Sequence, residues 1–391
     1  MSLTVLVNAG PWLPVPPRDY GGIETVVASL VSELRRRGVR VVLATVEEST
    51  LPAERYVTVF ASGQFAQIAA PYNRTMGIAH AHMQGVVAEL ERTADIDLVH
   101  DHVEVVGPSV LRAMAMAGPP VLQTLHWDLR KHPHFYGSFD GGGRIFFAGV
   151  SPRQLELAPA ALRRQALGAV PLGVQVDDFH PSSDKDDYVL VLGRITDVKG
   201  QDVAARACRD RGIELLLAGP VAGAREPREL DAELADPGSP LHQNGDVEFY
   251  LSRVRPLEGP DMRWIGAVSG TRKRELIARA RALLCPVRWE EPGGTAVIEA
   301  LASGTPVIGF RRGCLPMLVE HGVTGFLADD EDELARYLDR VDELDPLACR
   351  EAAVGSFSSG RMAERYIDLY AEVLRRVGGA RAAYEATSNT V

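Results

Sequence analysis

One segment, Glu-Glu-Pro-Gly-Gly-Thr-Ala-Val-Ile-Glu, ends at Glu299 and combines acidic side chains with a diglycine directly after an apolar run. Gly293 and Gly294 let the backbone approach a ligand, and a helix beginning near Thr295 presents free N–H groups that suit phosphate or sugar hydroxyls. Glu299, about one turn inside that helix, could accept hydrogen bonds from both hydroxyls of a ribose. The alternatives are a helix-dipole partner for Glu291 and a solvated helix face for Glu299. Their occurrence together favours a ligand site.

A second segment, Arg194-Ile-Thr-Asp-Val-Lys199-Gly200, follows the apolar run 188–192 and precedes a predicted helix. Arginine offers a fork of donors and lysine a point charge, so the pair could neutralise a diphosphate. The chain has only four lysines, which favours a function for Lys199 over a solvated loop.

A third segment, Tyr20-Gly21-Gly22-Ile23-Glu24, lies between the first predicted strand and the first predicted helix. Its two glycines could bring backbone amides to an anion, and a plain turn before the helix is an equal alternative. The chain has no Gly-x-Gly-x-x-Gly fingerprint and no Walker A loop. Nicotinamide oxidoreductases and P-loop phosphotransferases therefore lose their main support.

Histidines close two further predicted strands, in His100-Asp101-His102 and His126-Trp-Asp. A metal site would need these side chains to converge, and hydrogen-bonded histidines at the edge of a core are the more common arrangement. We therefore predict no metal here and interpret His126 as a polar contact in a ligand site.

Short apolar runs alternate with helical patterns along the chain, which is typical of parallel α/β architecture. The first series of predicted strands is 3–8, 39–46, 57–60, 97–100, 121–125 and 145–150, with helices from about 24 and near 75–92 and 107–117. The second series is 188–192, 214–218, 263–265, 282–286 and 306–309, with helices near 199–210, 272–281, 294–303, 315–321 and 330–342. Two Rossmann-like domains follow, and ligands of such sheets bind beyond the carboxyl ends of the strands.

Three segments lie outside this alternation. Prolines and an acidic run in 158–187 predict an interdomain connection, and the Gly/Pro-rich segment 221–262 predicts an irregular surface excursion. A last amphipathic helix is expected over 359–376, with a frayed tail after Gly378. The predicted domain bounds are 1–168 for the first domain and 169–358 for the second, followed by a C-terminal segment over 359–391.

Length and composition set the class of protein. The chain of 391 residues is too long for one ordinary core, and 46% hydrophobic with 24% charged residues excludes a disordered or fibrous chain. A net charge of −10 argues against a nucleic-acid binder. The start does not resemble a signal peptide, and no apolar stretch is long enough for a membrane helix, so we expect a soluble cytoplasmic protein without integral membrane association.

Cysteine spacing indicates neither a zinc site nor a redox dithiol. The four cysteines lie far apart, at Cys208, Cys285, Cys314 and Cys349. Buried single thiols are the expected interpretation.

An ordered set of motifs runs over nearly the whole chain. It comprises the Gly21-Gly22-x-Glu loop, Thr-Leu-His126, Pro171-Leu-Gly-Val-x₄-Phe179-x-Pro181, Gly193-Arg194…Lys199-Gly200, Glu291-x₇-Glu299 and Gly322-Val-Thr-Gly-Phe-Leu. This set resembles family 4 of the retaining glycosyltransferases. The resemblance implies a GT-B fold, with an acceptor domain over 1–168, a nucleotide-sugar donor domain over 169–358, and a C-terminal helix in 359–391 that returns to the first domain.

The resemblance also implies roles for the residues of the second domain. Arg194 and Lys199 would hold the donor diphosphate, and Glu299 would hold the nucleotide ribose. Glu291 would bind donor-sugar hydroxyls near the reaction centre. Backbone amides would assist it from Gly293, Gly294, Thr295 and Ala296.

In the first domain, the resemblance implies that His126 contacts the donor sugar and that Gly21 and Gly22 line the phosphate pocket. Such enzymes use no metal or other cofactor, because fixed cations and helix N-termini stabilise the leaving diphosphate. Configuration at the anomeric carbon is retained in a front-face displacement, in which the departing phosphate helps to deprotonate the acceptor.

Two departures from the family pattern bear on specificity. The usual Glu-Gly-Phe-Gly is Glu-Pro-Gly-Gly here, which reshapes the sugar pocket, and Met317 stands where the family has a carboxylate in Gly-x-Pro-Glu. The Val-Pro-Pro-x-x-Tyr-Gly-Gly opening and the Glu-Pro-Gly pattern resemble a subgroup that includes glycosyltransferases of actinobacterial natural-product pathways.

The predicted function is retaining transfer of a sugar from a nucleotide-diphosphate sugar to an acceptor, with a small molecule or natural product as the acceptor class. Two alternatives stay open. A nucleotide-sugar epimerase would need further acids placed to deprotonate the sugar. A non-catalytic nucleotide-sugar-binding regulatory protein is kept open by Met317.

Overall fold

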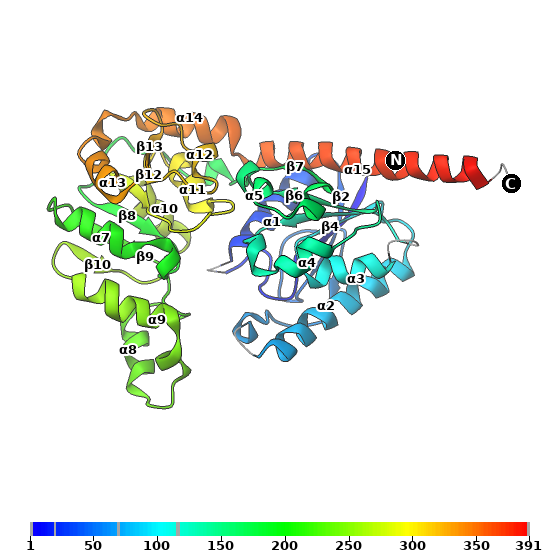
Figure 1. Cartoon of the computed structure of the whole chain (residues 1–391), viewed down its shortest axis with the longest axis horizontal. Coiled ribbons are helices and arrows are strands. Elements are labelled where there is room, and N and C mark those ends of the chain that lie inside the picture. Colours follow the sequence, from blue (N-terminus) through cyan, green and yellow to red (C-terminus); the bar gives the residue numbers. More distant parts are fainter. Residues whose placement is uncertain (1–2, 19–20, 69–70, 115–117, 389–391) are drawn as a thin grey trace. The chain divides into compact units, whose positions relative to one another are not determined.

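The computed structural model describes residues 3–18, 21–68, 71–114 and 118–388, without the side chains of Tyr72 and of 379–388. The chain forms two compact units, one of Met1–Gly173 with Ser359–Val391 and the other of Val174–Ser358 (Figure 1). Each unit is a parallel sheet covered by helices. The predicted class of two Rossmann-like α/β domains is therefore confirmed.

The first unit contains a seven-stranded sheet in the order β3-β2-β1-β4-β5-β6-β7. Its strands are β1 (Thr4–Asn8), β2 (Arg40–Thr45), β3 (Arg55–Thr58), β4 (Leu98–Asp101), β5 (Val121–Leu125), β6 (Ile145–Gly149) and β7 (Ala166–Ala169). All neighbouring strands pair in parallel. The strand order reverses between β1 and β4, so their carboxyl ends form the topological switch point of this unit.

Helices cover the first sheet. They are α1 (Gly22–Arg36), α2 (Tyr72–Arg92), α3 (Val106–Met114), α4 (Pro133–Ser138), α5 (Pro152–Glu156), α6 (Ala160–Arg163) and α15 (Ser359–Ser388). The predicted apolar stripe of α1 is confirmed, since Val27, Leu30 and Leu34 are buried. α15 packs on α1 and β5, and Arg37 at the end of α1 donates to the Glu364 carboxylate at 3.2 Å.

The second unit contains a six-stranded parallel sheet in the order β10-β9-β8-β11-β12-β13. Its strands are β8 (Val189–Leu192), β9 (Leu215–Ala218), β10 (Met262–Trp264), β11 (Ala282–Cys285), β12 (Val307–Phe310) and β13 (Gly325–Ala328). Its helices are α7 (Gln201–Arg209), α8 (Pro227–Ala235), α9 (Gly245–Phe249), α10 (Gly270–Arg279), α11 (Thr295–Ala302), α12 (Leu315–Leu318), α13 (Glu331–Leu338) and α14 (Pro346–Ser356). The order reverses between β8 and β11, which makes that junction the switch point.

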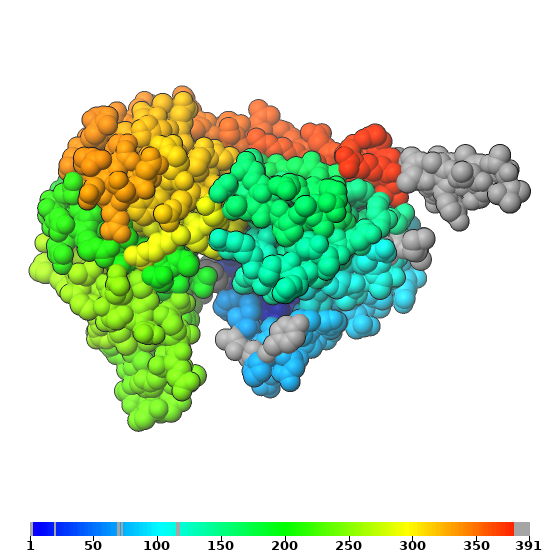
Figure 2. All heavy atoms as spheres, in the orientation of Figure 1, coloured from blue at the N-terminus to red at the C-terminus, as the bar shows by residue number. Residues whose placement is uncertain are grey.

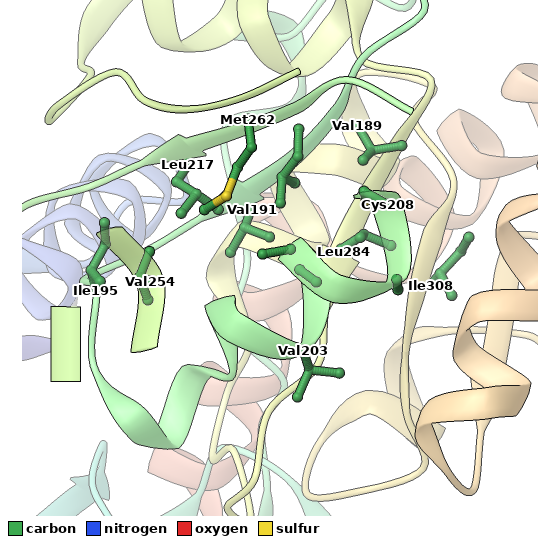
Figure 3. Packing of buried hydrophobic residues seen from close by; sticks show 14 of the residues in the cluster. Val189, Val191, Ile195, Val203, Cys208, Leu217, Val254, Met262, Leu284 and Ile308 are labelled. Atoms are coloured by element: carbon green, nitrogen blue, oxygen red, sulfur yellow. The ribbon is translucent and has the colours of Figure 1, made fainter. Parts of the chain in front are cut away.

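Apolar side chains join the second sheet to α7. Val191 of β8 and Leu284 of β11 are almost fully buried and belong to one apolar cluster with Val203 of the helix (Figure 3). Strands buried on both faces are nearly continuously apolar, as in Val-Leu-Val-Leu of β8 and Leu-Leu-Leu-Ala of β9. This core fixes the loops that leave the carboxyl ends of β8 and β11.

Three expectations for the segments outside the βα pattern are corrected. The segment 158–187 is not a bare connection, because it contains α6 and β7, and the first unit runs to Gly173 rather than 168. The Val170 amide donates to the Gly149 carbonyl at 2.8 Å, so backbone pairing with β6 continues beyond β7. α15 continues to Ser388, past the helix end predicted at 376 and into the tail predicted to be frayed.

The segment 221–262 is not irregular. It forms α8, α9 and a π-helical turn over Tyr250–Val254, and α8 and α9 project from the rest of their unit (Figure 2, light green). Leu230 of α8 and Val247 of α9 are buried, so these short helices have their own apolar contacts.

Candidate active site

The two acidic and basic motifs of the second unit lie at its switch point. β8 pairs with β11 through Val189 with Ala282 and Leu190 with Leu283, so the loops after these strands leave the sheet side by side. The loop after β8 leads to Lys199, and the loop after β11 leads to Glu291. Ligands of parallel α/β sheets bind at this position.

Lys199 and Glu291 are in direct contact. Lys199 Nζ lies 2.6 Å from Glu291 Oε2, and Trp289 Nε1 donates to the same oxygen at 2.8 Å. Lys199 Nζ also lies 5.6 Å from the centre of the Trp289 ring, within reach of a cation–π interaction. Two residues that are 92 positions apart in the chain thus form one charged group held by an aromatic side chain.

The ion pair keeps the lysine charged in a partly buried place. Burial favours the neutral amine, but the attraction of the Glu291 carboxylate outweighs it, so that the pKa of Lys199 is raised from its ordinary value. Lys199 is therefore a cation across the physiological pH range, as a ligand for a diphosphate must be.

Two glycines in the left-handed region make the approach of these loops possible. Gly200 has φ 69°, and a Cβ there would lie 2.1 Å from the Pro286 carbonyl oxygen. Gly294, the residue before α11, has φ 63°, and a Cβ there would lie 2.8 Å from Cys314 Sγ. A side chain at either position would push the loop after β8 or β12 away from the loop after β11.

The loop after β12 fixes the acidic pair in place. The Glu290 carboxylate accepts from the Gly313 amide at 2.9 Å, and the Cys314 amide donates to the Glu291 carbonyl at 2.8 Å. Glu290 therefore ties two loops together, while the Glu291 carboxylate points to Lys199. Met317, where the family has a carboxylate, is half-buried on α12.

Arg194 lies on the same loop as Lys199 and is exposed. Its carbonyl accepts from Gln201 Nε2 at 2.9 Å, and its guanidinium makes no ion pair with any described residue. Its charge opposes that of Lys199, on which it acts to lower the pKa. An anion placed between these cations would relieve that repulsion.

Glu299 lies about one turn inside α11 and is 5% exposed, so it is not on a solvated helix face. Its Oε1 lies 2.6 Å from Lys273 Nζ of α10. The first amides of α11, at Thr295 and Ala296, have no carbonyl within the helix to which they can donate. Gly293 is buried just before them.

His126 belongs to a histidine cluster in the first unit. Its Nε2 lies 2.7 Å from His102 Nδ1, and the ring of His100 lies 4.2 Å from that of His102. Burial lowers the pKa of His126 to about 3, so the ring is neutral. Of the three rings, His126 alone is more than slightly exposed.

The diglycine of the first unit begins α1. Thr25 donates through its amide and its hydroxyl to the Gly21 carbonyl, at 3.0 and 2.7 Å. A Cβ at Gly21 would lie 2.7 Å from Pro17 Cβ, whereas Gly22 has open space around it. Glu24 is 5% exposed, and burial raises its pKa to about 7. Tyr20 of the same motif lies outside the described residues.

The structure also bears on metal ligands, cysteines and membrane-spanning helices. Among the described residues, no group of three or more His, Cys, Asp or Glu side chains could hold a metal ion. The cysteines are free and largely buried, and burial raises the pKa of Cys285 to about 12. No helix in the described part of the chain is both long and apolar enough to cross a membrane.

Matches to two family models identify the class of this protein. Residues 175–353 match glycosyl transferases group 1, and residues 20–160 match glycosyltransferase family 4. The chain therefore belongs to the glycosyltransferases, and its two sheets form a GT-B fold.

Individual relatives agree with this assignment. The chain is 25% identical to an α-maltose-1-phosphate synthase of Mycolicibacterium smegmatis, over 92% of this chain and 97% of the relative. The crystal structure of AviGT4, a glycosyltransferase involved in avilamycin A biosynthesis, has a TM-score of 0.62 at 27% identity over 95% of this chain and 98% of that one. A sucrose-phosphate synthase of Thermosynechococcus elongatus, at 19% identity and TM-score 0.70, covers 95% of this chain and 99% of that one and shares the fold.

Sequence reasoning missed two residues of these clusters and the contact made by a third. Trp289 is one of four tryptophans and stands two positions before Glu291, and Lys273 is one of four lysines. The low number of tryptophans and lysines in the chain is the signal that could have singled out both residues. His102 was in view beside His100, but only the fold shows that it contacts His126.

Proposed function

We propose that the chain is a retaining glycosyltransferase that moves a sugar from a nucleoside-diphosphate sugar to a small-molecule acceptor. The observation that carries the proposal is the contact between Lys199 and Glu291 at the switch point of the second sheet. It joins a cation suited to a diphosphate with a carboxylate suited to sugar hydroxyls.

The residues of the second unit divide the donor among them. Lys199 and Arg194 would bind the diphosphate, since their two positive charges oppose the two or more negative charges of that group. Glu291 would accept hydrogen bonds from sugar hydroxyls and stabilise positive charge on the ring. Glu299, oriented by Lys273, would bind the ribose hydroxyls.

The first unit would contribute neutral groups. His126 would contact the donor sugar, and the backbone around Gly21 and Gly22 would approach its phosphate. On this view the first unit also carries the acceptor site, and the second unit is the donor domain.

In the reaction, the bond from the anomeric carbon to the diphosphate oxygen breaks, and its electron pair leaves with the diphosphate. The acceptor hydroxyl oxygen bonds to the anomeric carbon from the same face, and its proton passes to the departing phosphate oxygen. Lys199 and Arg194 would stabilise the charge that grows on the diphosphate, where such stabilisation has the largest effect on the rate. The products are a glycoside of retained configuration and the nucleoside diphosphate.

The natural-product acceptor is the finer part of the proposal. It is supported by the likeness to AviGT4, which is involved in the biosynthesis of avilamycin A. The Glu-Pro-Gly-Gly sequence places Pro292 and two glycines beside Glu291, without the aromatic side chain usual in the family. This favours a donor sugar or acceptor that needs a differently shaped pocket.

A thermal-shift screen of nucleotide sugars followed by a transfer assay tests the proposal. We expect one donor to raise Tm and then to yield an α-linked product from an α-linked donor, as read from the anomeric proton by NMR. Activity should persist in EDTA, since two side-chain cations and a helix N-terminus serve the leaving group. An inverted product, or activity that EDTA abolishes and Mg²⁺ restores, would contradict the mechanism. Epimerised sugar from the donor alone would indicate an epimerase. Binding of a nucleotide sugar without transfer to any acceptor of a panel would indicate a regulatory protein.

A further inference from the structure

Three histidine rings lie together at the carboxyl ends of β4 and β5. The centres of the His100 and His102 rings are 4.2 Å apart, and those of His102 and His126 are 5.1 Å apart. The proposed function uses only His126, although His102, 3% exposed, is in hydrogen-bond contact with it.

One proton lies between His102 and His126. Nδ1 of His102 and Nε2 of His126 are 2.7 Å apart, and burial lowers the pKa of both rings below the ordinary value. Both rings are therefore neutral at neutral pH, and each carries a proton on one nitrogen only. Either His102 donates from Nδ1, or His126 donates from Nε2.

The environment of His102 decides between these arrangements. Its Nε2 is buried and has no hydrogen-bond partner among the described residues. If His126 donated, the proton of His102 would have to be on this Nε2, as a buried N–H without an acceptor. If His102 donates from Nδ1, only a lone pair is left unpaired at Nε2. Buried N–H groups without an acceptor are the rarer and less favourable case.

The third ring does not disturb this arrangement. His100 Nδ1 lies 2.7 Å from the Tyr370 hydroxyl, and its Nε2 lies 2.8 Å from the Thr124 hydroxyl. Both nitrogens of His100 are thus occupied by groups of α15 and β5, and His102 remains the partner of His126.

We propose that His102 is a positioning residue that holds His126 in the Nδ1–H tautomer. The hydrogen bond at one imidazole nitrogen sets the proton at the other. His126 Nδ1 has no hydrogen-bond partner among the described residues, and the ring is half-buried. His126 thereby presents a hydrogen-bond donor to a sugar oxygen of the nucleotide sugar. The identity of this ligand rests on the proposed function, whereas the tautomer does not.

Nitrogen-15 NMR of the full chain, labelled at histidine, reads the tautomer directly. The His126 signals are assigned from their loss in His126→Gln. We expect the proton on Nδ1 of His126 and an unprotonated Nε2. A proton on Nε2 would overturn the inference, whatever the activity of the protein.

Two variants of nearly equal size test the role of the donor at position 102. The amide of His102→Asn can still donate where Nδ1–H donates now, whereas the carboxylate of His102→Asp can only accept. We expect His102→Asn to keep the tautomer and to retain kcat/KM within about threefold. His102→Asp should move the proton of His126 to Nε2 and lower kcat/KM for the donor about tenfold, as expected for one hydrogen bond. His80→Asn, on an exposed histidine, is the matched control.

The affinity for the free nucleoside diphosphate should not change in His102→Asp, because this ligand lacks the donor sugar that His126 would contact. Equal losses in affinity for the diphosphate and for the nucleotide sugar would overturn the sugar contact. Failure of every donor to be turned over would contradict the proposed function and leave the NMR test of the tautomer in place. Should His102→Asp fail to fold, the NMR measurement on the native chain still decides the inference.

Discussion

The two units place opposite kinds of groups at the switch points of similar sheets. In the first unit, Asn8 Nδ2 on β1 donates to Asp101 Oδ1 on β4 at 2.7 Å, and Asn8 Oδ1 lies 2.7 Å from His82 Nε2. All three side chains are fully or nearly fully buried. Burial raises the pKa of Asp101 to about 7. In the second unit the corresponding position holds the charged contact of Lys199 with Glu291.

This difference indicates a division of labour. Buried histidines whose pKa lies well below the ordinary value stay neutral and hold their geometry without attracting counter-ions, as His102 does beside His126. Charged groups at a partly exposed junction can respond to charge that grows on a ligand, where electrostatic stabilisation has its largest effect. We infer that the first unit positions and the second unit stabilises charge. Four measurements test this comparison.

The largest effect is expected from Lys199→Ala. The substitution removes one diphosphate cation and leaves Glu291 without its ionic partner. We expect kcat/KM for the donor to fall by about 10³, in the range for loss of one preorganised electrostatic contact. Lys131→Ala, on an exposed lysine of the first unit, is the control and should stay within about threefold. A fall in kcat/KM of less than tenfold for Lys199→Ala would contradict the inference that the second unit acts by stabilising charge.

Arg194→Ala should raise the donor KM and lower kcat, because charge on the diphosphate grows in the transition state. We expect a fall in kcat/KM of about 10², smaller than for Lys199 since Arg194 is exposed to solvent. Arg279→Ala is the matched control. Arg279 pairs with Asp186, which lies before the amino end of β8, whereas Arg194 follows the carboxyl end of the same strand. Equal effects of both arginine variants on steady-state kinetics would contradict a localised site.

The first unit should be the acid-sensitive one. Burial lowers the pKa of His82 to about 4 and that of His100 to about 3. Below about pH 6.5 the unfolded chain binds protons that these rings do not, so the free energy of unfolding falls by about 1.4 kcal/mol per pH unit for each ring. Asp101 and Glu24 act in the opposite direction, since their raised pKa values make them bind protons more tightly when folded.

The variant His82→Gln isolates one ring. Urea unfolding at pH 7, 6 and 5 should show a pH slope smaller by about 1.4 kcal/mol per unit than in the native chain. His134→Gln, at an exposed position, should leave the slope unchanged. Lys199 should contribute no slope in this range, because its pKa is raised from 10.5 and its contribution is lost only as the pH rises through the folded value. Equal slopes for the native chain and His82→Gln would show that the buried network does not titrate as expected.

The sequence predicted most of the fold because its strands are short, apolar and buried on both faces. β5 was placed at both ends, and each of the other predicted strands overlaps an observed one. β13 was missed since it begins with a glycine, which is unfavourable in strands. A Cβ at Gly325 would lie 2.0 Å from the Val307 carbonyl oxygen, so close strand packing requires this residue. α8 and α9 were missed because charged residues and prolines obscure their short apolar stripes.

The candidate site was predicted in its residues but not in its contacts. Position after a strand was enough to single out Lys199 and Glu291, yet their pairing follows from the adjacency of β8 and β11, a property of topology. Lys273 lies on a helix before β11, and only packing of α10 on α11 brings it to Glu299. Periodicity describes one element at a time and does not report such contacts.

The central claim is that Glu291 acts on the sugar and Glu299 on the nucleotide, and one pair of isosteric variants tests it. We expect Glu291→Gln to lower kcat by about 10² to 10³ with little change in affinity for the free nucleoside diphosphate, because that ligand lacks the transferred sugar. Glu299→Gln should first weaken binding of the nucleoside diphosphate. Calorimetry with the nucleotide and steady-state kinetics with the donor measure both. Near-normal turnover of Glu291→Gln, or a loss of nucleotide affinity as large as that of Glu299→Gln, would contradict the account.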